Sequence, residues 1–322
     1  MKKLYMLLAV VLIMVIAGCS SSSDPIPASN DYTSANIGTL KYVPAGSFLR
    51  DGNNDNKNIS TVSTAFRMSQ HEITREQFYT IMGVDPSNLS YSTWISDPVQ
   101  KVNWYHAIAF CNKLSIAEGF TRVYNVAGFT TDQDWIDLAF GSIPTSEDSD
   151  WDTATATWTN TGYRLPTEME WEWAAMGATS GSGWTSPTYL TGYGKLFAGS
   201  DSILADGSGG SHLIVDYAWY SVNSDFTTHP VGTKLGNELG LYDMSGNVCE
   251  WVWDALDDDY YPNYPGGSLD NNVYRGGSDT SYRFGRGGSG FDTASDVTVA
   301  YRRPITPPSY QYYDVGFRVV RN

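Results

Sequence analysis

The sequence has few cysteines, few histidines and little positive charge. Three of its 322 residues are cysteine and four are histidine, and 20 lysines and arginines stand against 35 aspartates and glutamates. The formal charge of −15, without a concentrated basic patch, argues against nucleic acid and anionic membrane surfaces as partners. The histidines, at positions 71, 106, 212 and 229, do not have the spacing of metal ligands, so we expect no histidine-based metal centre.

The sequence also lacks a long low-complexity linker or charge run that would separate two domains, so we expect one elaborated domain. Its hydrophobic content of 41% is enough for a core, and 31 glycines, 22 tyrosines and 11 tryptophans favour turns and short strands over long helices. Cys111 lies in an apolar helical pattern and is expected to be a buried thiol. A disulfide between Cys111 and Cys249 is the alternative in an oxidising envelope.

The N-terminus predicts export and lipid attachment. Two lysines precede an apolar run from Leu4 to Ile16, which is too short for an ordinary membrane span and predicts a signal peptide over residues 1–18. The run ends in Ile16-Ala17-Gly18-Cys19, which looks like a bacterial lipobox with Cys19 as the lipidated residue. An ordinary secretory peptide is the alternative. Residues 19–36 are expected to form a flexible tether to the membrane.

Local signals place several elements in the remaining domain, residues 37–322. A strand is expected over residues 38–43. Thr74 and Asn103 are each followed by apolar residues at helical spacing, so each is expected to cap a helix. A third helix should begin at Pro166 and Thr167, with glutamates in its first turn and tryptophans facing the core.

Four sequence blocks, taken in this order, carry a family resemblance. They are Tyr163–Ala175, Gly240–Trp251, Arg286–Ser289 and Gly316–Arg321. Together they resemble the formylglycine-generating enzyme (sulfatase-modifying factor) family. The resemblance implies an α+β domain with a C-type lectin fold, rich in loops, with short strands and two or three helices. Residues 125–159, rich in aspartate, threonine and tryptophan, are an insertion of unknown role.

The resemblance also implies one structural calcium ion. Its ligands would be the side chains of Asp243 and Glu250 and the carbonyl oxygens of Gly246 and Val248, a donor set that suits a hard cation. Gly246 permits the tight turn that such carbonyl ligands need. The alternative is a turn in which Asp243 caps backbone amides and Glu250 pairs with an arginine such as Arg318.

The catalytic centre of the family is not matched. Its members use two cysteines, three and eight residues after the serine of the Arg286–Ser289 block, to hold copper and activate oxygen. Asp292 and Val297 occupy these positions here. A carboxylate and an isopropyl group cannot replace two thiolates as ligands of cuprous ion, so we expect neither copper nor enzyme activity. The rival hypothesis, a copper-dependent oxidase, predicts oxygen consumption on a cysteine peptide.

The C-terminal region instead has the composition of a binding surface. Tyrosine offers large contact area at low entropic cost, while serine, threonine and aspartate adapt to polar partners. Between the last two blocks, over residues 286–321, the pattern resembles the variable proteins of diversity-generating retroelements, of the treponemal lipoprotein type. The positions that would vary and contact a ligand are Phe291, Asp292, Thr293, Ser295, Asp296, Tyr301, Ile305, Thr306, Ser309, Tyr310, Tyr312, Tyr313 and Asp314.

The predicted function is therefore a non-catalytic lipoprotein that binds a protein or glycan through residues 286–321. The absence of aspartate after Cys19 favours the bacterial outer membrane or cell surface, where the lipid anchor holds the domain. The alternative is an accessory envelope lipoprotein of constant sequence, with a partner bound through residues 125–159.

Overall fold

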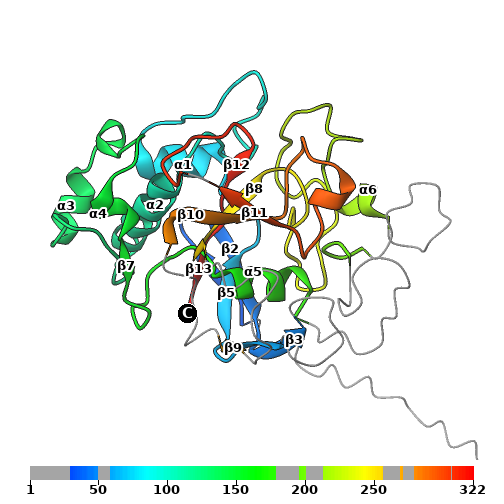
Figure 1. Ribbon diagram of the computed structural model, residues 1–322, viewed down its shortest axis with the longest axis horizontal. Helices are drawn as coiled ribbons and strands as arrows, with labels where there is room; N and C mark the ends of the chain where they lie inside the picture. The colour runs from blue at the N-terminus through cyan, green and yellow to red at the C-terminus, as the bar shows by residue number, and fades with distance from the viewer. Residues whose placement is uncertain are drawn as a thin grey trace, which may run out of the picture.

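The computed structural model describes residues 30–49, 59–178, 196–200, 213–256, 269–270, 279–305 and 307–322 (Figure 1). The expected signal peptide, the predicted lipidation site Cys19 and the predicted contact residue Thr306 lie outside these ranges. Among the described residues, no helix is both long enough and apolar enough to cross a membrane.

Short strands and a few helices alternate along the described chain, as the expected α+β class requires. The strands are β1 (Tyr32–Ser34), β2 (Gly38–Val43), β3 (Gly46–Leu49), β4 (Ile59–Val62), β5 (Phe66–Ser69), β6 (Tyr124–Asn125), β7 (Thr155–Ala156), β8 (Cys249–Leu256), β9 (Leu269–Asp270), β10 (Asp279–Arg286), β11 (Arg302–Ile305), β12 (Val315–Gly316) and β13 (Val320–Arg321). The helices are α1 (Arg75–Met82), α2 (Trp104–Ala117), α3 (Asp132–Asp137), α4 (Ser149–Asp152), α5 (Glu168–Ala175) and α6 (Ile214–Tyr217), with 3₁₀ turns at Phe140–Ser142 and Ala294–Asp296.

The described strands include two four-stranded sheets. One sheet has the order β1-β2-β5-β13 and so joins the first and last described strands, while the other has the order β11-β10-β8-β12. In the second sheet β12 runs parallel to β8, with Val315 opposite Cys249. Residues 19–36 were expected to form a tether, but Tyr32–Ser34 within them form β1 and pair with β2. The folded domain therefore begins earlier than residue 37.

The three longest described helices begin where the sequence predicted. Thr74, Asn103 and Thr167 each form a capping box, in which the cap and the third helical residue satisfy each other's backbone amide. In α2 that third residue is His106, whose Nδ1 accepts from the Asn103 amide at 3.2 Å. Its ring stacks on Phe140 and is fully buried, so His106 is a core histidine rather than a metal ligand.

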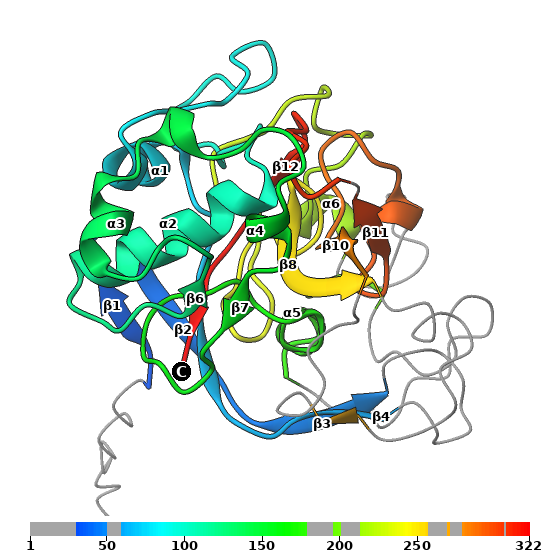
Figure 2. The same cartoon turned by 60° about the vertical axis from the view of Figure 1, so that its left-hand side comes forward.

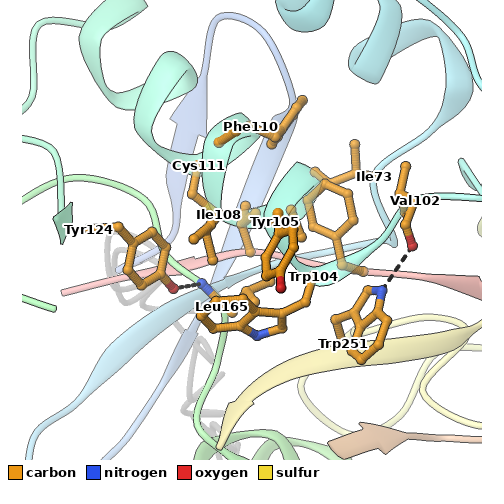
Figure 3. Close-up of a cluster of buried hydrophobic side chains, with 14 of the residues drawn as sticks. Ile73, Val102, Trp104, Tyr105, Ile108, Phe110, Cys111, Tyr124, Leu165 and Trp251 are labelled. Carbon is orange, nitrogen blue, oxygen red and sulfur yellow. Dashed lines mark hydrogen bonds between the residues drawn. The ribbon is translucent and has the colours of Figure 1, made fainter. Parts of the chain in front are cut away.

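The main core lies between α2 and the β8 sheet (Figure 3). Trp104 and Trp251 are fully buried, and each indole donates across the interface to a backbone carbonyl, of Val252 and Val102 respectively, at 3.0 Å. These bonds satisfy the only polar atom of each buried ring, so both tryptophans fill the core without leaving a buried N–H group unpaired.

The insertion packs onto this core. α3 and α4 lie beside α2 (Figure 2), and the side chains of Trp135 and Trp151 face inward and are buried. Cys111 on α2 is also buried and is a free thiol, as is Cys249 on β8. The prediction of a buried Cys111 is confirmed, and the disulfide alternative is not what the structure shows.

Candidate functional site

Arg286, the last residue of β10, anchors the first end of the C-terminal region. Its guanidinium is fully buried and donates to the carbonyl oxygens of Val299, Ala300 and Tyr301 at 2.7 to 3.1 Å. It also donates to Glu172 of α5 at 2.7 Å. A charged donor with several buried acceptors makes strong hydrogen bonds, so residues 299–301 are held rigidly against the sheet.

Arg318 anchors the second end through a buried ion pair. Its Nε donates to both carboxylate oxygens of Glu250, at 2.8 and 2.7 Å, and its Nη2 donates to Oε1 at 2.7 Å. Both side chains are fully buried. Glu250 also accepts from the Trp171 indole at 2.7 Å, and the other Arg318 donors reach the carbonyls of Ser69 and Tyr242. Every polar atom of this pair is used inside the protein.

Glu72 holds the turn that precedes β8. Its buried carboxylate accepts from the Asn247 side-chain amide at 2.8 Å and from the Val248 amide at 3.0 Å. Burial raises the pKa of Glu72 well above its ordinary value, and the nearby carboxylates of Asp243 and Glu250 add to the increase. Three buried carboxylates thus surround one guanidinium, that of Arg318.

The predicted calcium ligands lie around this turn. Asp243 Oδ2 accepts from the Gly232 amide at 2.7 Å, while its buried Oδ1 has no hydrogen-bond partner. Glu250, in contrast, spends both oxygens on Arg318 and Trp171. Asp243 could offer an oxygen to a cation beside the carbonyls of Gly246 and Val248, but Glu250 in this position does not fit. The geometry matches the capped turn with an ion pair, and calcium stays a prediction.

A chelator experiment tests the calcium prediction. If Asp243 and the turn bind calcium, saturating calcium should raise the melting temperature by about 5 °C over a chelator-treated sample, because binding to the folded state adds stability. Differential scanning calorimetry of the purified protein measures the difference. The Asp243→Asn variant should lose it. An equal melting temperature with calcium and with chelator would leave only the capped turn.

The residues predicted to contact a ligand differ widely in exposure. Four are exposed, and these are Thr293, Ser295, Tyr310 and Tyr313. Five are partly exposed, and these are Phe291, Asp292, Asp296, Tyr301 and Tyr312. They lie on two loops, which flank β11 and run between the two buried arginines. The two loops, orange and red in Figure 1, therefore present most of the predicted residues to solvent.

Three predicted contact residues are instead part of the scaffold. Ile305 packs into the main core, and Ser309 is buried with its carbonyl accepting from the Asn103 side chain at 2.9 Å. Asp314 is buried and pairs with Arg303 at 2.7 Å. Side chains that are buried in this way cannot touch a ligand. Composition alone could not separate them from their exposed neighbours.

An aromatic cluster joins the C-terminal region to two loops that the sequence analysis did not single out. The Tyr91 ring centroid lies 5.3 Å from that of Phe291 and 4.8 Å from that of Tyr313, and these two lie 4.9 Å apart. Phe226 lies 6.4 Å from Phe291. Tyr91 lies in residues 90–96, which are rich in serine, threonine and aromatic residues, and this composition could have indicated a binding loop. No comparable signal marked Phe226.

The two positions that carry cysteines in the enzymes have unrelated roles here. Asp292 accepts from the amide and the hydroxyl of Ser289, each at 2.8 Å, and so closes a tight turn. Val297 is fully buried in a small apolar cluster. Burial raises the pKa of Cys249 to about 12, so this thiol is protonated at neutral pH and is a poor ligand for a soft metal.

A buried carboxylate beneath the C-terminal region predicts a pH dependence of stability. Asp254 on β8 accepts from the Glu168 amide at 2.7 Å. Burial, together with the charge of Glu168, raises the pKa of Asp254 to about 7 from an ordinary value of 3.8. Between these pH values the folded state keeps a proton that the unfolded state has lost, so this stabilising contribution falls as the pH rises.

We expect the free energy of unfolding of the wild type, relative to that of Asp254→Asn, to decrease between about pH 4 and pH 7, as measured by urea denaturation of both proteins at each pH. Asp254→Asn keeps an oxygen for the Glu168 amide and removes the titration. The comparison cancels the other buried groups: Asp243, whose pKa burial raises to about 6, acts in the same direction, whereas His71 and His106, whose pKa values burial lowers to about 4 and about 3, act in the opposite direction. Parallel profiles of the two proteins would contradict the assignment to Asp254.

The fold agrees with that of known proteins. Residues 29–322 match the family described as the sulfatase-modifying factor enzyme 1-like domain. The solved structure of Treponema denticola variable protein 1 is similar over 92% of this chain and 99% of its own, with 36% sequence identity and a TM-score of 0.74. These two findings confirm the resemblance drawn from the four sequence blocks and the fold that it implied.

Two sequence relatives have names that indicate different roles. The chaperone protein LppX of Paenibacillus barcinonensis is 28% identical over 328 residues, 100% of both chains. The formylglycine-generating enzyme of Streptomyces coelicolor is 33% identical over 118 residues, which are 36% of this chain and 33% of the enzyme. Enzymes and proteins with other names thus share this domain, and the domain alone does not assign an activity.

Proposed function

This chain belongs to the family of sulfatase-modifying factor enzyme 1-like domains, and we propose that it is a non-catalytic member that binds a protein or glycan ligand through residues 286–321. The observation that carries the proposal is the pair of exposed tyrosines, Tyr310 and Tyr313, with 53% and 42% of their surfaces accessible, on a region whose ends are anchored by buried arginines. Rigid presentation of tyrosine limits the entropy lost on binding.

The chemistry of the former catalytic positions supports a non-catalytic role. Neither residue is a cysteine: Asp292 closes a turn through Ser289, and Val297 packs in a small apolar cluster. The described cysteines are buried, free thiols, and burial raises the pKa of Cys249 to about 12 and that of Cys111 well above its ordinary value. A copper-dependent reaction that needs two accessible thiolates has no support from these residues.

The likeness to Treponema denticola variable protein 1 supports diversification of the C-terminal region. In such a protein the scaffold must tolerate many side chains between fixed ends. Here Arg286 and Arg318 bind backbone carbonyls and Glu250, whose chemistry does not change when neighbouring loop side chains do. Buried positions such as Asp314 should tolerate fewer changes, because Asp314 pairs with Arg303.

Lipid attachment at Cys19 would place many copies of the domain on one membrane. We infer an outer-membrane or cell-surface location from the lipobox-like sequence and from the polar residues that follow it. Many anchored copies facing one target can strengthen a weak single contact, since later contacts form at high effective concentration. A surface of modest affinity would then suffice.

Sequencing tests the proposal. We expect codons 286–321, read deeply in a clonal culture and in sister isolates, to vary at exposed or partly exposed positions such as Phe291, Tyr310 and Tyr313. Gly316, Phe317 and Arg318 should stay constant, because their side chains or backbone are buried in the scaffold. Uniform codons throughout would contradict a diversified receptor.

A second candidate function is an accessory or chaperone-like envelope lipoprotein, which the full-length match to chaperone protein LppX favours. Its partner would bind the insertion, residues 125–159. The insertion turns its large rings inward, since Trp135 and Trp151 are buried, and it exposes Ile136 on α3. It therefore offers less apolar surface than the C-terminal face, which is why we rank this function second.

A further inference from the structure

Two loops outside residues 286–321 present large apolar side chains beside the predicted contact residues. Phe226 is 56% exposed and Val222 is 71% exposed, while Leu89, two residues before Tyr91, is 69% exposed. Exposed apolar side chains that gather in one place mark interaction surfaces more often than single ones do. We call Tyr91, Val222, Phe226, Phe291 and Tyr313 the composite face.

Backbone hydrogen bonds tie the three segments of the composite face together. The Thr228 amide donates to the Tyr91 carbonyl at 2.7 Å, and the Ser221 amide donates to the Asp292 carbonyl at 2.9 Å. The buried Ser224 hydroxyl donates to the Gly290 carbonyl and accepts from the Phe226 amide at 3.1 Å. The loops around Tyr91 and Phe226 are therefore positioned as firmly as the C-terminal region that they border.

The backbone at Phe226 is strained in a way that exposes its ring. Asp225 and Phe226 have φ angles of 53° and 54°, in the left-handed region that residues with a Cβ rarely adopt. Both side chains are exposed. Because the Phe226 ring points into solvent, this strained backbone does not improve the packing of the core. Strained backbone of this kind is concentrated at ligand-binding positions.

The chemistry of the composite face fits a polypeptide better than a glycan. Sugar hydroxyls need hydrogen-bond partners, and covering them with aliphatic groups leaves them unpaired at a cost. Three of the five side chains of the composite face, Val222, Phe226 and Phe291, offer no such partner. Protein interfaces, in contrast, have apolar centres built from aromatic and aliphatic side chains with a polar rim.

Charge defines the partner further. Asp225 is next to Phe226 and Asp292 is next to Phe291, and Asp296 lies on the same loop as Phe291. Two cations lie nearby: Arg303, which is paired with Asp314 and also interacts with Asp292, and Lys101, whose amide donates to the Tyr312 carbonyl. Asp225, which is exposed, and Asp296, which is partly exposed, remain on the phenylalanine side. The phenylalanine side of the face is therefore acidic, on a chain with a formal charge of −15. Basic side chains on a partner would be complementary to it.

The structure thus assigns a partner class to the composite face: a polypeptide segment with apolar side chains and a neighbouring basic residue, which contacts Val222 and Phe226 as well as Phe291 and Tyr313. This assignment rests on the proposed function and deepens it. It makes Phe226 a constant anchor beside side chains that can vary.

The test uses a phage-displayed library of random dodecapeptides, selected on the full-length protein in detergent micelles, with a glycan array as the parallel probe. Selected peptides are synthesised, and their affinities are measured for the wild type and three variants. Phe226→Asn removes the ring, and asparagine tolerates the left-handed backbone. Tyr313→Ala removes a ring from the C-terminal region. Ile136→Ala, an exposed apolar position on α3, is the matched control.

We expect enriched peptides to combine aromatic or aliphatic residues with lysine or arginine. Their affinity should fall at least about tenfold in Phe226→Asn and in Tyr313→Ala and stay unchanged in Ile136→Ala. A loss in Tyr313→Ala alone would overturn the role of Phe226 and keep the proposed function. Glycan binding that Tyr313→Ala abolishes, without peptide enrichment, would overturn the polypeptide assignment only. Peptides that bind all three variants equally would overturn both.

Discussion

Replacing Glu250 with glutamine should lower the free energy of unfolding by about 3–5 kcal/mol, one of the two largest effects that we expect in this protein. The substitution preserves shape but removes the carboxylate to which the buried Arg318 guanidinium donates its hydrogen bonds, while the carboxylates of Glu72 and Asp243 only lie nearby. Arg318 donates three hydrogen bonds to Glu250, at 2.7 to 2.8 Å, and both side chains are fully buried. Water cannot replace the lost partner at such a site. Urea denaturation followed by tryptophan fluorescence measures the loss.

Further variants distinguish the buried ion pair from a general loss of contacts. Asp132→Asn breaks a surface pair with Arg122, in which the Asp132 side chain is 60% exposed, and should cost less than about 1 kcal/mol. Arg318→Met, alone and combined with Glu250→Gln, completes a double-mutant cycle, and the two losses should be less than additive because the bonds between these side chains are lost only once. Additive losses would show that the pair itself is not the cause.

Replacing Gly246 with alanine should destabilise the domain by more than about 3 kcal/mol, because two penalties combine. Gly246 has a φ angle of 82°, which disfavours any residue with a Cβ. An added Cβ would also lie 2.0 Å from the Trp219 carbonyl oxygen, which is backbone and cannot turn away. The turn that carries Asn247 and Val248 would have to move, and with it the start of β8.

Gly83 provides the matched control for this substitution. It ends α1 with a φ angle of 76°, and an added Cβ there would meet nothing within 4 Å. Gly83→Ala should therefore cost only the backbone penalty of about 1–2 kcal/mol. The difference between the two variants, measured by urea denaturation, isolates the close approach to Trp219. Equal losses would show that backbone strain alone accounts for Gly246.

Local signals were sufficient for the elements that depend on neighbouring residues. The caps at Thr74 and Asn103 and the helix start at Thr167 were predicted correctly, because a capping side chain bonds to an amide three residues away whatever the rest of the chain does. The strand over residues 38–43 was also correct, whereas β1, over residues 32–34, was mistaken for a tether. β1 is short and is stabilised by pairing with β2, which its own composition does not reveal.

The sequence by itself determined the family, the α+β class, the absence of the two catalytic cysteines and the tyrosine-rich character of residues 286–321. Only the tertiary structure decided which of these side chains reach solvent. Asp314 and Tyr313 are adjacent and both polar, yet Asp314 turns inward to Arg303 while Tyr313 joins Tyr91 and Phe291 at the surface. Contacts between segments far apart in the chain fix these directions, and such contacts leave no local pattern in a single sequence.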